Sequence, residues 1–187
     1  MPVFITTSRR PTRRVRSFCK ELARVFPRSV YVNRGKMNLD EVLLEASARG
    51  ASHALVVNVR KGNPGRLDLY EVGSGRLKAS FVCLGVKLAR EMKVAPQPLS
   101  RGAVAVEGEG DLEALAKTLA EVLDLPLVKG RPQASSYATV ALLSPRRGYL
   151  GAINFLDLSK GRPMGPLIRV KRLLSVGGLS AQSDHSG

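Results

Sequence analysis

The chain has 187 residues, of which 44% are hydrophobic, so it can bury a core. Its formal net charge of +15 favours a polyanionic partner, which is more often nucleic acid than an anionic membrane surface. Its two cysteines, Cys19 and Cys83, cannot hold zinc alone and sit in apolar patterns typical of reduced core residues. No apolar run approaches the ~20 residues that cross a bilayer and no signal peptide is visible, which leads us to expect a cytoplasmic protein.

The opening residues predict a buried strand over 3–7, a turn, and an amphipathic helix that Thr12 can cap and Pro27 ends. Apolar residues in this helix recur at i, i+3, i+4, i+7 and i+11, which is one helical face. They are Val15, Phe18, Cys19, Leu22 and Phe26. At about 100° per residue, the opposite face carries the cations Arg13, Arg16, Lys20 and Arg24. An apolar face on the core with cations facing outward is suited to binding phosphates.

The rest of the first half predicts one helix and four strands. A strand over 29–33 leads into a basic turn, and Asn38 followed by Glu41 forms a capping-box-like helix start, with Gly50 at the helix end. Three strand-like segments then follow, over 53–59, 67–72 and 77–86, separated by hairpin turns over 61–65 and 73–75.

Residues 93–102, with Pro96 and Pro98, predict a crossover loop, after which the pattern starts again. The second half predicts a strand over 103–106, a helix from Gly110-Asp111 to Pro126, and strands over 125–128, 137–143, 149–158 and 167–174. Strand, helix ending in Pro, strand and hairpins therefore occur twice. We expect an α/β fold of two pseudo-repeated halves, 1–92 and 103–174, and a Gly- and Ser-rich disordered tail over 175–187.

Catalytic signatures are largely missing from the sequence. There is no phosphate-binding loop of the Gly-x-x-x-x-Gly-Lys-Ser/Thr type. The Gly108-Glu-Gly110 segment is crowded by carboxylates that would repel phosphate and is better explained as a loop and helix cap. His53 opens a strand and His185 lies in the tail, so no nucleophile–base pair or carboxylate cluster stands out. We therefore predict no catalytic residues, no metal site and no cofactor.

Positive charge is concentrated near the ends of the chain. Residues 1–40 carry ten Lys and Arg against two acids, and residues 141–187 carry seven against two. Five arginines fall within eight residues around the first helical turn, where free backbone N–H groups also favour anions. The candidate RNA-binding residues are Arg9, Arg10, Arg13, Arg14 and Arg16 at this helix, Arg34 and Lys36 in one turn, Arg146 and Arg147 in another, and Arg169 and Lys171 on one side of a strand. The alternative is that these clusters are ordinary solvated charges.

The first forty residues also carry a family resemblance. The run Ile5-Thr-Thr-Ser-Arg-x-Pro-Thr-x-Arg-x-Arg-x-Phe-x-Lys-Glu-Leu22, then Phe26-Pro27 and Val32-Asn-Arg-Gly-Lys36, resembles the Brix-domain family. It is most similar to the branch that contains the Imp-four subunit of the small-subunit processome, in a compact archaeal form. The resemblance implies a pseudo-symmetric fold whose halves resemble anticodon-binding domains of class II tRNA synthetases. It also implies RNA binding in ribosome assembly.

Together, these observations predict a non-catalytic RNA-binding factor in ribosome biogenesis, acting in rRNA processing and small-subunit assembly. Its expected partner is precursor rRNA, with other ribosome-assembly proteins as further candidates. Two rival interpretations remain open: a protein-interaction scaffold whose basic face meets acidic assembly partners, and a tRNA-binding module. A nuclease or methyltransferase has the least support from the residues.

Overall fold

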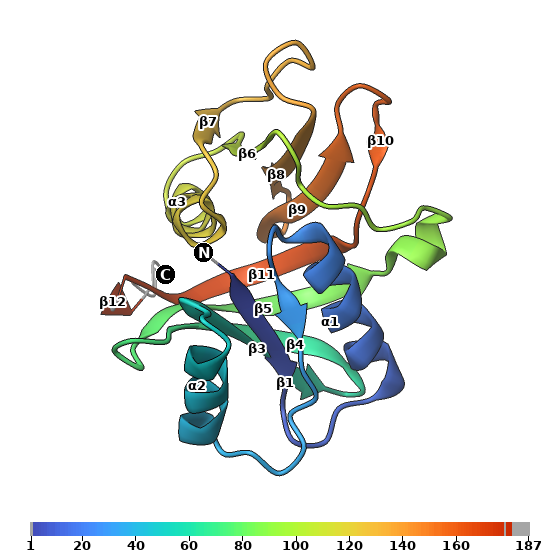
Figure 1. Ribbon diagram of the computed structural model, residues 1–187. Helices are drawn as coiled ribbons and strands as arrows, with labels where there is room; N and C mark the ends of the chain where they lie inside the picture. The colour runs from blue at the N-terminus through green and yellow to red at the C-terminus, as the bar shows by residue number, and fades with distance from the viewer. Residues whose placement is uncertain (1, 178, 181–187) are drawn as a thin grey trace.

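One β-sheet runs through the part of the chain that the computed structural model describes, residues 2–177 and 179–180 (Figure 1). The strands of the first half are β1 (Val3–Thr7), β2 (Val30–Tyr31), β3 (His53–Arg60), β4 (Asn63–Glu71) and β5 (Leu77–Lys87). Those of the second half are β6 (Gly102–Val106), β7 (Leu127–Lys129), β8 (Thr139–Arg146), β9 (Tyr149–Asp157), β10 (Arg162–Pro163), β11 (Leu167–Val176) and β12 (Leu179–Ser180). They lie in the order β2-β1-β3-β4-β5-β11-β9-β8-β6-β7, with β10 paired to β9 and β12 to β11.

The sheet consists of two blocks with the same succession of strand pairings. In the first block β1 is parallel to β2 and β3, and β3, β4 and β5 are antiparallel neighbours. In the second block β6 is parallel to β7 and β8, and β8, β9 and β11 are antiparallel neighbours. The antiparallel pairing of β5 with β11 joins the blocks. The predicted α/β class is confirmed, and both blocks contain strand, helix, strand and hairpins in the predicted order.

The helices cover the two faces of the sheet unequally. α1 (Arg13–Val25) and α3 (Asp111–Leu123) contribute to one large apolar core, whereas α2 (Leu39–Ala48) packs on a separate cluster. Side chains alternate along β1, so Val3 and Ile5 join the large core and Phe4 joins the cluster under α2. None of the helices in the described residues is long and apolar enough to cross a membrane.

The helix ends follow the predicted signals. The Thr12 hydroxyl accepts a hydrogen bond from the Val15 N–H at 3.3 Å and caps α1, which ends two residues before Pro27. Asn38 and Glu41 form a complete capping box at the start of α2, with bonds of 2.9 Å and 2.7 Å. These caps fix where each helix begins, and therefore which residues surround its first turn.

The predicted crossover packs tightly against α1. Leu99 is 2% exposed, and its N–H donates to the carbonyl of Val25 at the end of α1 over 2.9 Å. The N–H of Gln97 donates to the carbonyl of Met164 over 3.0 Å, so the same segment also contacts the second block. The connection between the blocks is therefore held to the core through Leu99, while most of its other residues are exposed.

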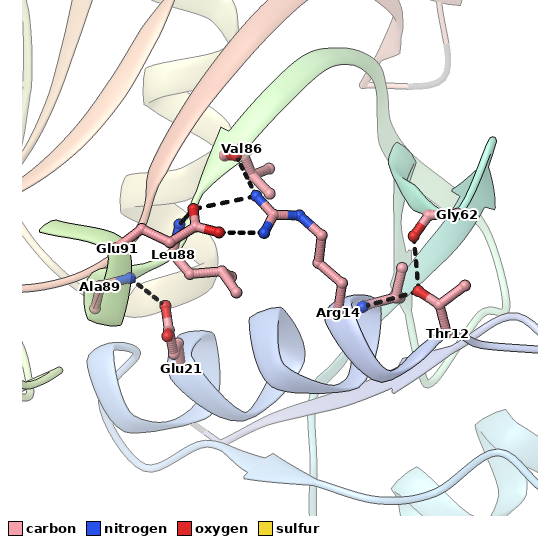
Figure 2. A network of polar contacts seen from close by, with 9 residues as sticks. Thr12, Arg14, Glu21, Gly62, Val86, Leu88, Ala89 and Glu91 are labelled. Carbon is pink, nitrogen blue, oxygen red and sulfur yellow. Dashed lines mark hydrogen bonds and ion pairs between the residues drawn. The ribbon is translucent and has the colours of Figure 1, made fainter.

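Two carboxylates hold the 3-10 helix η1 (Ala89–Met92), which precedes the crossover, against α1 (Figure 2). The buried Glu21 in α1 accepts a hydrogen bond from the Ala89 N–H at 2.8 Å, and burial raises the pKa of this carboxyl group. Glu91 in η1 accepts from the Leu88 N–H at 2.9 Å and forms an ion pair with Arg14. The hydrogen bond from Arg14, followed by that from Leu88, lowers the pKa of Glu91 from 4.5 to about 2.

Several element boundaries differ from the predicted ones. The turn predicted over 61–65 contains only Lys61 and Gly62, because β4 begins at Asn63. Both turn residues have left-handed backbone, with φ of 49° and 78°. β11 continues to Val176 and pairs with β12, so the predicted disordered tail is wrong at its start; residues 181–187 lie outside the described residues. Periodicity does not reveal η1, β10 or β12, because two to four residues are too few to show a period.

The first residues of β4, which the sequence analysis assigned to the turn before it, contain a β-bulge. The register between β3 and β4 shifts after Asn58, which leaves Gly65 without a partner. A Cβ atom at Gly65 would lie 2.3 Å from the Cβ of Arg60, so only glycine fits there without moving the backbone.

Replacing Gly65 by alanine is expected to lower the free energy of unfolding by about 1–3 kcal/mol, because the added methyl group forces β3 and β4 apart. Gly73→Ala is the matched control, since a Cβ there meets nothing within 4 Å. Urea unfolding followed by circular dichroism measures both. Equal stability of Gly65→Ala and Gly73→Ala would show that the close approach at Gly65 is not a constraint.

The Glu91 ion pair predicts a pH dependence of stability. Because its pKa is lower in the folded chain, Glu91 stabilises the fold above its ordinary pKa of 4.5, and this contribution is lost as the pH falls towards about 2. Glu91 is partly solvent-exposed, so its contribution is expected to be about 1 kcal/mol or less. Urea unfolding should show Glu91→Gln less stable than the parent at about pH 6, with the difference shrinking at about pH 3. A difference that is the same at both pH values would contradict this role.

Candidate nucleic-acid interface

The predicted arginine cluster surrounds the start of α1, as the sequence indicated. Arg9, Arg10 and Arg13 are exposed, and Arg16 is half-buried, with its Nη1 donating to the carbonyl of Pro11 at 3.2 Å. Arg14 is half-buried and makes contacts within the fold. It donates to the carbonyl of Val86 at 3.0 Å in addition to its ion pair with Glu91 (Figure 2), so its charge is partly compensated within the fold.

A tertiary hydrogen bond brings a second basic segment to the same place. The Thr12 hydroxyl donates to the carbonyl of Gly62 at 2.7 Å, while the same oxygen caps α1 (Figure 2). The β3–β4 turn is thereby docked against the first turn of α1. The exposed side chains of Arg60, the last residue of β3, and of Lys61 in the turn come with it. The sequence marked Lys61 only as a turn residue, and nothing local to it indicates this contact across 50 residues.

Arg34 connects the basic turn before α2 to the end of β1. Its guanidinium donates from Nε to the carbonyl of Met37 at 2.8 Å and from Nη1 to that of Thr7 at 3.1 Å. Arg9 reaches the same Met37 carbonyl from its Nε at 3.4 Å. Burial, and after it the nearby charge of Arg9, lowers the pKa of Arg34. Arg34 therefore shapes the loop, whereas the neighbouring Lys36 is exposed.

A groove of about 510 Å³ lies where the start of α1, the β3–β4 turn, β5 and β11 meet. Its lining includes five cations: Arg14, Arg60, Lys61, Arg169 and Lys171. The other lining residues are Asn63, Pro64, Gly65, Cys83, Leu84, Gly85 and Val86, so no carboxylate of the described chain is among them. Of the five cations, only Arg14 forms an ion pair within the described residues. The groove thus carries strong uncompensated positive charge.

The structure places the predicted strand pair in this groove and the predicted hairpin pair elsewhere. Arg169 and Lys171 both line the groove and are exposed. Arg146 and Arg147 are exposed at the β8–β9 hairpin, where Arg146 donates to the carbonyl of Pro145 at 3.0 Å, and they do not line the groove.

The cysteines and the histidine of the described residues are buried or half-buried. Burial raises the pKa of Cys19 and raises that of Cys83 to about 12, so both thiols stay protonated. Burial lowers the pKa of His53, whose Nδ1 lies 3.0 Å from the Ser52 hydroxyl. No group of three or more His, Cys, Asp or Glu side chains gathers within the described residues.

Comparison with known proteins finds related sequences and structures, although no protein-family model matches the chain. The chain is 38% identical over 186 residues to a probable Brix domain-containing ribosomal biogenesis protein of Pyrococcus furiosus, covering 90% of this chain and 83% of the relative. It is 39% identical over 144 residues to the protein of the same name in Methanopyrus kandleri, covering 74% and 73% of the two chains.

Solved structures agree with these sequence relatives. The crystal structure of a probable ribosomal biogenesis protein from Aeropyrum pernix K1 matches with a TM-score of 0.78 and 29% identity, covering 94% of this chain and 98% of the other. Mil, described as an archaeal Imp4-like protein, has the same fold, with a TM-score of 0.66 at 24% identity and coverage of 93% and 99%. Identity of this degree over most of both chains confirms the resemblance seen in the first forty residues: the chain belongs to the Brix-domain family.

Proposed function

We propose that the protein is a non-catalytic RNA-binding factor in ribosome biogenesis that holds precursor rRNA of the small subunit through its phosphates. The observation that carries this proposal is the groove lined by five cations and no carboxylate, next to the exposed arginines at the start of α1. The relatives named as ribosomal biogenesis proteins supply the cellular process. A cytoplasmic location and other ribosome-assembly proteins as partners are part of the same proposal.

The binding mechanism is electrostatic. Arg and Lys side chains that neutralise RNA phosphates release condensed counterions, which supplies sequence-independent affinity. The cations here are held by rigid elements: α1 is anchored by its buried apolar face, and the β3–β4 turn is anchored by the bond from Thr12 to Gly62. Side chains on such supports lose less freedom on binding than side chains on mobile loops. The buried thiols, whose pKa is raised, and the half-buried His53, whose pKa is lowered, support a binding role over a catalytic one.

We further propose that the two halves, 1–92 and 103–174, are pseudo-repeats of a unit that resembles the anticodon-binding domain of class II tRNA synthetases, joined by residues 93–102. The identical succession of parallel and antiparallel pairings in the two blocks supports this division. The cationic turns Arg60-Lys61-Gly62 and Arg146-Arg147-Gly148 then occupy equivalent hairpins.

The two halves differ in charge at these equivalent places. α1 begins among arginines, whereas the first turn of α3 contains Asp111 and Glu113. A third carboxylate, Glu107, lies close to the second hairpin, where it accepts a hydrogen bond from the Ser144 hydroxyl at 2.8 Å. Carboxylates near Arg146 and Arg147 weaken the attraction for phosphate. The first half is therefore proposed as the main RNA surface and the second hairpin as a weaker contact.

RNA affinity should fall steeply with salt. If about five to eight cations contact phosphates, the logarithm of the association constant should fall with the logarithm of the salt concentration with a slope of roughly 3.5 to 5.6, at about 0.7 per contact for single strands. Fluorescence anisotropy of a labelled small-subunit rRNA fragment over a salt series measures the slope. An affinity that does not change with salt would refute phosphate-dominated binding, and a tRNA that outcompetes the rRNA fragment would favour a tRNA-binding module.

Replacing Arg9, Arg13 and Arg16 together by Gln should weaken RNA binding by well over tenfold and lower the salt slope by about 2, because three phosphate contacts are lost. Arg13 and Arg16 are not among the buried residues of α1, and Arg9 is exposed before the helix, so the fold should persist, as circular dichroism can check. The matched variant with Arg146 and Arg147 changed to Gln should lose less affinity. Parental affinity in the folded triple variant would mean that the start of α1 is not the binding face.

A further inference from the structure

Bulges in three adjacent strands, β4, β5 and β11, meet at the groove. Gly65 is the unpaired residue of β4. In the pairing of β5 with β11, Arg169 lies opposite Gly85 and Val170 lies opposite Cys83, so Leu84 of β5 has no partner. The next pair is Arg172 with Val82, so Lys171 of β11 has no partner either. All three unpaired residues line the groove. Bulges bend strands and redirect side chains, and they recur next to functional sites.

The floor of the groove has the shape and chemistry that a flat ring needs. Gly85 has no side chain, and the Arg169 guanidinium lies over it: a Cβ at Gly85 would be 3.1 Å from Nη2 and 3.7 Å from Cζ. The guanidinium therefore packs close to the β5 backbone at a position without a side chain, and a planar guanidinium is a group on which a base can stack. Leu84, the bulged residue of β5, is 49% exposed although it is a large apolar side chain in a central strand. Leu84 and Arg169 both line the groove, so the groove offers an exposed apolar side chain as well as a planar cation.

The walls of the groove carry the charges that would hold a nucleotide's phosphates. Arg60 ends β3, Lys61 lies in the β3–β4 turn, and Lys171 lies in β11. The volume of about 510 Å³ lies within the roughly 300–1,000 Å³ of small-molecule pockets. A duplex presents only its phosphates to such a groove, because its bases are stacked inside. An unpaired base can leave the stack and lie on an Arg plane or an apolar side chain.

We propose that the groove takes one unpaired nucleotide of single-stranded RNA. Its base lies between Leu84 and the Arg169 guanidinium, and its neighbouring phosphates lie on Arg60 and Lys61 at one wall and on Lys171 at the other. The protein therefore selects single-stranded segments over duplex at this groove. Because the groove is also part of the phosphate-binding surface, this binding mode rests on the RNA binding proposed above.

The test separates stacking from charge. A short single-stranded RNA of mixed sequence and the fully paired duplex of the same sequence are each titrated with the full-length protein at one salt concentration. The parent should bind the single strand more tightly. Arg169→Lys keeps the charge but removes the plane, and Leu84→Ala removes the apolar contact. Each should weaken single-strand binding by about tenfold, with duplex affinity and the salt slope of single-strand binding unchanged.

Arg162→Lys is the matched control, because it makes the same exchange at an exposed arginine of β10 outside the groove and should alter neither affinity. Thermal unfolding checks that the variants are folded; both changed side chains are solvent-exposed. Equal losses for single strand and duplex, or no loss in either variant, would overturn the nucleotide site while leaving phosphate binding intact. Absence of salt-dependent RNA binding by the parent would refute the proposed function itself.

Discussion

The antiparallel pairing of β5 with β11 is the contact on which the rest of this structure depends. These strands belong to different blocks and are separated by about eighty residues of chain, yet they pair along most of their length, from Lys87 opposite Leu167 to Ala79 opposite Val176. Their pairing makes the sheet continuous, so α1 and α3 share one apolar core, in which Phe26 and Phe155 from the two blocks pack edge to face with ring centroids 6.0 Å apart. The register shifts along the same pair leave Leu84 and Lys171 unpaired in the groove.

What the sequence predicted well depends on neighbours along the chain. The cap at Thr12, the buried stripe of α1 and the capping box at Asn38 and Glu41 are local patterns, and all are present in the structure. The arginines around the first turn of α1 could be located for the same reason. Most predicted strands appear within a few residues of their expected bounds, because alternation and hairpin turns are also local.

What the sequence missed depends on contacts between distant residues. Arg60 and Lys61 join the candidate interface only because the Thr12 hydroxyl reaches Gly62. Leu84 and Gly85 look like ordinary strand positions, and only the pairing with β11 shows that one is bulged out and the other lies under Arg169. Conversely, Arg14 and Arg34 look like free cations in the sequence, but the fold uses their donors to hold η1 and the loop before α2. A cluster of cations in sequence is thus a mixture of binding groups and structural ones.

The two edge strands of the sheet are short, and this affects how readily molecules of the protein associate with one another. The sheet ends at β2 and β7, which have two and three residues. An open sheet edge is a template for pairing with a strand from another molecule. The length of the edge strand limits how many backbone hydrogen bonds that second strand can form. Edge strands this short disfavour intermolecular strand pairing. Together with the net charge of +15, which makes copies of the chain repel one another, they favour a protein that stays dispersed at high concentration.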